Sequence, residues 1–265
     1  MVIEADGYLD VVAGRVVRPA VIVVDGEKIA AVNPAARPPG AKLISLPGHV
    51  LLPGLMDSHV HLNYIIGPGW ETEPVRFTGA DFAMRAIPHA KATLLAGFTT
   101  VRDLGTGLGF SDVALMRAID AGWVPGPRMI PAGHALSITG GHCDQTTGLG
   151  PGVEPPEFTS GNADGVDAVI KAVRYQVKHG AKVIKICATA GVLSFEGPVG
   201  AQQYSLEELK AAADEAHRHG LQDRGSRARH RGHHRLERGG HRQHRARLDH
   251  DGARRRRSSR RTATS

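Results

Sequence analysis

The first 50 residues alternate short apolar runs with turn residues. VIEADGYLDVV, RPAVIVVDG, EKIAAVNP and AKLISLPG each fit a β-strand, and the DGEK segment between two of these runs fits a hairpin turn. This pattern predicts a small β-sheet over residues 1–50, ahead of a larger main domain.

From residue 51 the pattern changes to strands that alternate with helices. The apolar stretches LLPGLMDSHVHL, TTVRDLG, RMIPAG and KVIKICA fit buried strands, and helical patterns follow them. The last helix opens with Ser205 and Glu208 in a capping box and stops at Gly220. Repeated strand–helix units indicate an α/β fold with a parallel sheet. Four such units over residues 51–222 amount to half of a (β/α)8 barrel.

After residue 222 this alternation stops. Residues 223–265 contain no Val, Ile, Met, Phe, Tyr, Trp or Cys, and only two Leu. Such a segment cannot bury enough apolar surface to offset its ordering entropy, so we expect a disordered tail. The tail holds 15 Arg against four acidic residues, a balance of +11, whereas the net charge of the whole chain is +7. The basic character therefore belongs to the tail alone.

The composition also bears on the cellular compartment. No apolar run approaches the ~18 residues of a membrane span, and the first ten residues do not resemble a secretory signal. The two cysteines, Cys143 and Cys187, are too few for a disulfide framework, which is typical of the reducing cytosol. We therefore expect a cytoplasmic protein without a membrane partner.

Two histidines, His59 and His61, end the first strand of the α/β part. They share one face with Asp57, because side chains alternate along a strand. Parallel barrels carry their reactive groups at the carboxyl ends of their strands, where neutral imidazoles suit Zn²⁺. The alternative is a surface or packing role, since paired histidines at strand ends are common.

Lys185 lies inside the apolar strand KVIKICA, on the same face as Val183 and Cys187. A charged amine is costly to bury, so the pKa of Lys185 should fall and its neutral amine would react with CO2. The resulting carbamate is an anionic oxygen ligand able to bridge two metals. Alternatively, Lys185 reaches solvent at the strand end or pairs with a carboxylate.

Three motifs in their order resemble the amidohydrolase superfamily: LPGHVLLPGLMDSHVHL, GFTTVRDLG and GAKVIKICATAGV. Within it they most resemble the imidazolonepropionase-like and Xaa-Pro dipeptidase-like branch, from about residue 5 to residue 222. The resemblance implies a metal-dependent (β/α)8 barrel and a small β-sandwich built from both chain ends. It also implies a small-molecule or dipeptide substrate, and members are often homo-oligomeric.

The resemblance assigns roles to individual residues. His59 and His61 would be metal ligands, and Lys185 would be the carbamylated ligand that bridges two ions. Zn²⁺ is favoured, although Mn²⁺, Co²⁺ and Fe²⁺ are also compatible with these ligands. His142, in ITGGHCD after the third strand, would contact the substrate, or would have only a local turn role.

Other polar residues have simpler interpretations. Arg102 and Asp103 would pair with each other in a structural role at the end of the second strand. His217 and His219 would be surface residues in the last turn of a helix, where they favour its dipole.

The implied reaction needs more than this sequence supplies. Two metals would polarise the scissile carbonyl and lower the pKa of a shared water, and the resulting hydroxide would attack an amide or peptide C–N bond. A carboxylate would carry the proton to the leaving nitrogen. In the family, that aspartate comes from the eighth strand and two further histidines come from the fifth and sixth, and none has a motif match in this chain.

A change of reading frame near Gln222 would explain the missing strands. With freely chosen codons, residues 223–230 and 240–248 can be encoded so that the neighbouring frame reads T-A-V-H-A-H-G and G-I-D-S-I-E-H-G. Both are segments that the family would supply as its fifth and sixth strands. We therefore predict that the chain is truncated by a frameshift, which the nucleotide sequence around codon 222 tests.

Two other functions compete with a metal-dependent amidohydrolase. The chain as written would be an inactive fragment, because half a barrel leaves the edge of its fourth strand unpaired. Alternatively, the Arg-rich tail would bind nucleic acid or another acidic surface through phosphate contacts. We consider nucleic acid a poor fit, because the tail has neither interleaved aromatic residues nor a folded motif.

Overall fold

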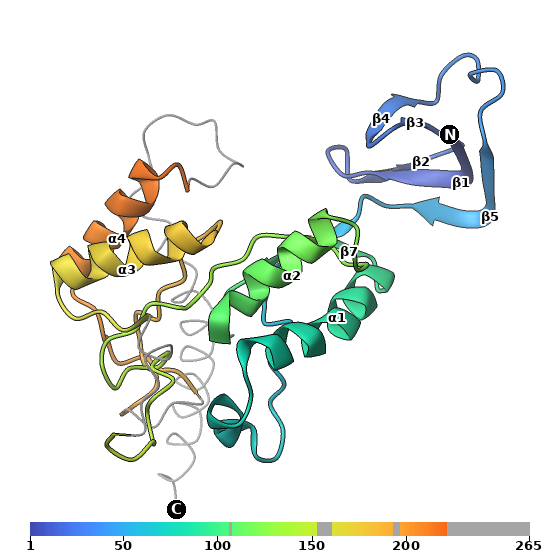
Figure 1. Cartoon of the computed structure of the whole chain (residues 1–265). Coiled ribbons are helices and arrows are strands. Elements are labelled where there is room, and N and C mark those ends of the chain that lie inside the picture. The colour runs from blue at the N-terminus through green and yellow to red at the C-terminus, as the bar shows by residue number, and fades with distance from the viewer. Residues whose placement is uncertain (106–107, 153–160, 193–196, 222–265) are drawn as a thin grey trace, which may run out of the picture. The chain divides into compact units, whose positions relative to one another are not determined.

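The computed structural model describes residues 1–105, 108–152, 161–192 and 197–221 (Figure 1). The described residues belong to one compact unit, Met1–Leu221. The predicted tail therefore lies outside the described residues.

The N-terminal segment forms a five-stranded sheet. Its strands are β1 (Val2–Asp10), β2 (Arg15–Val17), β3 (Ala20–Asp25), β4 (Lys28–Val32) and β5 (Leu43–Leu51). β2 and β3 pair antiparallel with successive parts of β1, and β5 pairs parallel with it. β3 and β4 form the hairpin around the predicted turn. The strands expected in this segment are therefore present, with the short β2 in addition.

The second sheet is parallel, with β6 (Leu55–Val60), β7 (Phe98–Asp103) and β8 (Arg128–Met129) in consecutive order. The 3₁₀ helix η1 (Trp70–Val75) and helix α1 (Gly79–Leu95) connect β6 to β7. The 3₁₀ helix η2 (Leu108–Phe110) and helix α2 (Ser111–Asp120) connect β7 to β8. The predicted α/β alternation is confirmed over these elements.

The segment after β8 continues the parallel arrangement without forming a regular strand. Its backbone carries the parallel bridge between Leu136 and Ile186. Leu136 N donates to Lys185 O at 2.8 Å, and Cys187 N donates to Leu136 O at 2.9 Å. The segment KVIKICA therefore lies beside residues 131–136, parallel to them as expected, but through isolated pairings.

Helices α3 (Val166–His179) and α4 (Leu206–Arg218) pack against each other. The predicted capping box of α4 is confirmed, because Glu208 N donates to Ser205 Oγ and Ser205 N donates to Glu208 Oε2. His217 and His219 are exposed at the end of α4, as the sequence predicts.

Two larger apolar cores stabilise the α/β part, beside a small third cluster around Phe82 and Leu108. The first lies between α1, α2 and the parallel sheet and includes Ala86, Ala90, Val101, Val113, Leu115 and Met129. The second lies under α3 and α4 and includes Leu136, Val169, Val173, Tyr204 and Ala212. Both cores hold the strand ends that carry the predicted site. Among the described residues, no helix combines the length and the apolar character that a transmembrane segment needs.

Candidate metal centre

The first strand of the parallel sheet presents the two predicted histidines together. His59 lies in β6, and His61 follows the end of that strand. Their ring centroids are 5.3 Å apart, and the ring planes meet at 72°. The Asp57 carboxylate accepts a hydrogen bond from His59 N at 2.9 Å. The period of the strand therefore brings both imidazoles to one side.

A backbone carbonyl orients the imidazole of His61. Its Nδ1 lies 2.7 Å from Gly105 O, so Nδ1–H donates and Nε2 is left as the nitrogen with a lone pair for a metal. Gly105 has a φ of 82°, and a Cβ at this position would overlap the carbonyl oxygen of Gly133. Glycine is therefore required at the residue that orients His61.

Asp103 stabilises the backbone around His61 and Gly105. This buried carboxylate accepts hydrogen bonds from Leu62 N at 3.0 Å and from Gly105 N at 3.1 Å. Asp103 thus fixes Leu62, which follows His61, and Gly105, whose carbonyl oxygen accepts from the imidazole of His61. Burial, with a smaller effect from the nearby Asp112, raises the pKa of Asp103 to about 7.

The predicted pair between Arg102 and Asp103 is wrong. Arg102 Nε instead donates to Ser58 O at 2.7 Å. Adjacent residues of a strand point to opposite faces, so the carboxylate turns into the buried interior while the charge of Arg102 acts on His59 and Lys185.

Lys185 lies close enough to both histidines for its charge to act on them. Burial is the main cause that lowers the pKa of His59 and of His61, and the charge of Lys185 lowers both further. The pKa of Lys185 itself is lowered, first by burial and then by the charge of Arg102. The charge of Lys185 thus reaches both histidines, and the environment of each of the three residues favours its neutral form.

These three side chains fit a divalent ion. Neutral imidazole is the form of histidine that binds Zn²⁺ and similar metals, and the Nδ1–H bond of His61 is the outer contact that metal-binding histidines make. A neutral amine at Lys185 fits less directly, because it becomes an oxygen ligand only after carbamylation.

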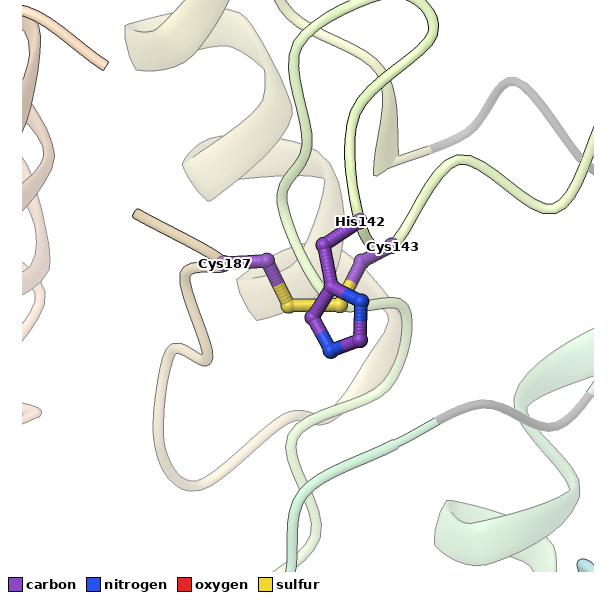
Figure 2. Close-up of side chains that lie close together, drawn as sticks. All are labelled: His142, Cys143 and Cys187. Carbon is purple, nitrogen blue, oxygen red and sulfur yellow. A yellow bond between two sulfur atoms is a disulfide. The ribbon is translucent and has the colours of Figure 1, made fainter. Parts of the chain in front are cut away.

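The fourth predicted residue, His142, lies in a separate cluster with Cys143 and Cys187 (Figure 2). Its backbone N donates to Gln203 Oε1 at 3.0 Å, and a Cβ on Gly191 would overlap its ring. The two cysteines, which the sequence analysis took as typical of a reducing compartment, are joined by a disulfide. No spacing signal pointed to this pair, because 44 residues separate the two positions.

Comparison with known proteins identifies the family. The model of the amidohydrolase family matches residues 50–252, so this chain belongs to the amidohydrolase family. The resemblance predicted from the sequence motifs is therefore confirmed. The family generally uses divalent metals and acts on small-molecule substrates.

Three proteins are similar to this chain over most of its length. Ochratoxinase of Aspergillus niger is 35% identical over 227 residues, which cover 77% of this chain and 45% of the relative. A Xaa-Pro dipeptidase with bound methionine in its active site superposes with a TM-score of 0.76 at 33% identity, covering 83% of this chain and 54% of that one. A prolidase complexed with N-methylphosphonate-L-proline superposes with a TM-score of 0.72 at 33% identity, covering 83% and 54%. The chain thus spans about half the length of these relatives.

Proposed function

We propose that this chain carries the metal-binding half of an amidohydrolase that hydrolyses a C–N bond of an amide or peptide. His59 and His61 bind one or two divalent ions, with Zn²⁺ the best fit, and Lys185 completes the site as a carbamate. The observation that carries this proposal is the effect of the Lys185 charge on the pKa of both imidazoles, although the two segments lie more than 120 residues apart in the chain.

The proposed architecture is the first half of a (β/α)8 barrel. Its strands are β6, β7, β8 and the segment that contains Lys185, in the order of the chain. The consecutive parallel pairing of these segments supports this arrangement, as do the two dipeptidase-like structures. In such a barrel the carboxyl ends of the strands form the active site, which is where His61 and Asp103 lie.

The carbamate at Lys185 forms by addition of CO2. The amine nitrogen makes a bond to the carbon of CO2, one C=O π bond breaks as its electron pair moves to oxygen, and the amine gives one proton to water, which leaves an anionic oxygen donor. Because burial and Arg102 both lower the pKa of Lys185, the neutral amine that this addition requires is more populated than in a free lysine.

A bound divalent ion supplies Lewis acidity, which polarises the scissile carbonyl and lowers the pKa of water at the site. The chain supplies the positioning. Gly105 O keeps the His61 proton on Nδ1, and Asp103 holds Gly105 in place. We further propose that His142 contacts the substrate when Cys143 and Cys187 are joined by their disulfide. The names of the relatives support an amide or a Xaa-Pro dipeptide as the substrate.

Metal content and hydrolysis of Xaa-Pro dipeptides test the proposal on the purified full chain in its oxidised form, in which Cys143 and Cys187 are joined by a disulfide. We expect bound metal in the wild type and in His49→Ala, a control at an exposed histidine, and its loss in His59→Ala and His61→Ala. Hydrolysis that follows metal content supports the enzyme, whereas metal without hydrolysis supports an inactive fragment of one. Wild-type protein that binds no metal contradicts the proposed site.

A further inference from the structure

Three side chains that bind metals well meet outside the proposed centre. One atom each of His142, Cys143 and Cys187 lies within 4.8 Å of the other two. Figure 2 shows the imidazole of His142 beside the two sulfur atoms. This cluster of His142, Cys143 and Cys187 shares no residue with the centre of His59, His61 and Lys185.

Backbone hydrogen bonds hold the two cysteines independently of their disulfide. Cys143 N donates to Ser137 Oγ at 3.3 Å, and Cys187 N donates to Leu136 O at 2.9 Å. The buried Asp144 carboxylate accepts from Gly140 N at 2.7 Å and from Thr146 N at 2.9 Å, which tightens the turn that carries Cys143. Reduction of the disulfide therefore leaves both sulfurs positioned near each other.

His142 is positioned by two contacts of its own. Gln203 Oε1 accepts from its backbone N, and the absence of a side chain at Gly191 makes room for its ring. The ring is thereby kept beside the sulfurs, and all three ligands are placed before any ion binds.

We propose that the reduced chain binds a thiophilic divalent ion such as Zn²⁺ through His142, Cys143 and Cys187, and that the disulfide is the metal-free state of the same site. Two cysteines and one histidine are a known zinc donor set, and three protein ligands leave a fourth position for water. On one tetrahedral ion the two sulfurs stand roughly 3.8 Å apart, given Zn–S distances of about 2.3 Å. Because bonded sulfurs cannot reach that separation, metal and disulfide exclude each other.

The two states interconvert by a balanced exchange. A dithiol reductant gives two electrons and two protons to the disulfide, which breaks the S–S bond and forms two thiols, while the reductant becomes a disulfide. Binding of the ion then displaces the two thiol protons to water. The site therefore couples metal binding to the redox state of the chain.

Cobalt(II) is a suitable probe, because thiolate ligation gives a charge-transfer absorption that His59, His61 and Lys185 cannot produce. The full chain is reduced, freed of reductant and titrated with Co²⁺. We expect this absorption to reach the intensity of one thiolate-bound ion per chain, to vanish after oxidation with diamide, and to return on renewed reduction. Oxidation and reduction of one sample need no variant, so a folding defect cannot mimic the result.

Variants assign the ligands. Cys143→Ser and Cys187→Ser should each abolish the absorption, and His142→Ala should weaken Co²⁺ binding by at least about tenfold, the lower range for loss of an outer contact alone. His217→Ala, at an exposed histidine of α4, serves as the matched control and should bind as the wild type does. Reduced wild type without the absorption overturns the proposal, as does an oxidised chain that retains it.

Discussion

The orientation of His61 depends on a buried carboxylate that does not itself contact the imidazole. Asp103 binds the backbone on both sides of the interaction, at Leu62 and at Gly105. The proposed metal ligand is thus held by a chain of three hydrogen bonds that ends in the interior of the protein.

Asp103→Asn should therefore weaken both stability and zinc binding. The new amide NH2 cannot accept from a backbone N–H, so one buried donor loses its partner at a cost of about 1–3 kcal/mol. Displacement of Gly105 should lower zinc affinity by about 10–100-fold, as for other outer contacts of metal ligands. Urea unfolding and zinc titration measure the two effects, with the exposed Asp25→Asn as the control. Unchanged zinc affinity in a folded variant would show that Asp103 does not position the site.

His134 is buried and gives the chain a pH dependence that the sequence does not reveal. Burial lowers its pKa to about 4, and its ring packs edge-on against Phe110 at 4.5 Å. Between pH 6.5 and 4 the unfolded chain binds a proton that the folded chain refuses, so this residue makes stability fall as the pH falls. Asp103 acts in the opposite direction, because its raised pKa lets the folded chain keep a proton up to about pH 7.

His134→Gln isolates the first of these two effects. From pH 7 to pH 5 the wild type should lose about 2 kcal/mol more stability than the variant, given ~1.4 kcal/mol per pKa unit. Urea unfolding at both pH values measures this difference, and the exposed His49→Gln should behave as the wild type does. Equal losses in His134→Gln and the wild type would mean that His134 is not held neutral.

At the scale of elements, one acidic residue links α3 to α4 by an ion pair, in addition to the apolar core beneath the two helices. Glu215 is 2% exposed and accepts from Arg174 Nε at 2.6 Å and from Arg218 Nη1 at 2.9 Å. The hydrogen bond from Arg174 is the main cause that lowers the pKa of Glu215 to about 2. Its carboxylate therefore stabilises the fold above about pH 4.5, and this contribution is lost as the pH falls toward 2.

Glu215→Gln should lower the urea midpoint of unfolding relative to the wild type at pH 7. The difference between the two midpoints should be smaller at pH 3. The variant keeps the size of the side chain but removes the charge that both arginines contact. Glu207→Gln, an exposed residue in the first turn of α4, is the matched control. A deficit of the same size at both pH values would contradict the role of the charge.

The elements themselves were largely predictable, because hydrophobic period and caps are local signals. The capping box at Ser205 and the alternation from β6 to α2 follow from neighbours in the sequence. The segment around Lys185 differs from a regular strand because its pairings with residues 131–136 and with residues 201–203 are isolated and form no continuous ladder.

The site was predictable only in part, because some of its contacts depend on residues that are not neighbours in the sequence. The side shared by His59 and His61 follows from the strand period. The links from Asp103 to Gly105 and from Cys143 to Cys187 depend on turns and on tertiary contacts that no local pattern encodes.

At the scale of the whole molecule, the chain belongs to the amidohydrolase family and spans about half the length of its relatives. Its proposed metal site nevertheless draws on two segments of the α/β part that lie far apart in the chain, at β6 and at Lys185. An ion held there should tie these distant segments together and stabilise the fold.

Zinc at 100 times its Kd should therefore raise the free energy of unfolding by about 2.7 kcal/mol. A chelator should reverse the effect, and His59→Ala should not respond to zinc. The experiment uses the oxidised chain, so that the cysteines are unavailable as ligands. Equal stability with and without zinc would mean that the folded chain binds the ion no more tightly than the unfolded chain does.

The most direct measurement of the central claim is the X-ray absorption spectrum at the zinc edge of the oxidised, zinc-loaded full chain. The proposed ligands predict nitrogen and oxygen neighbours at about 2.0–2.2 Å, two of them imidazoles, and loss of the imidazole signal in the double variant His59→Ala/His61→Ala. A spectrum dominated by sulfur, or one that the double variant leaves unchanged, would contradict a metal centre built on His59, His61 and Lys185.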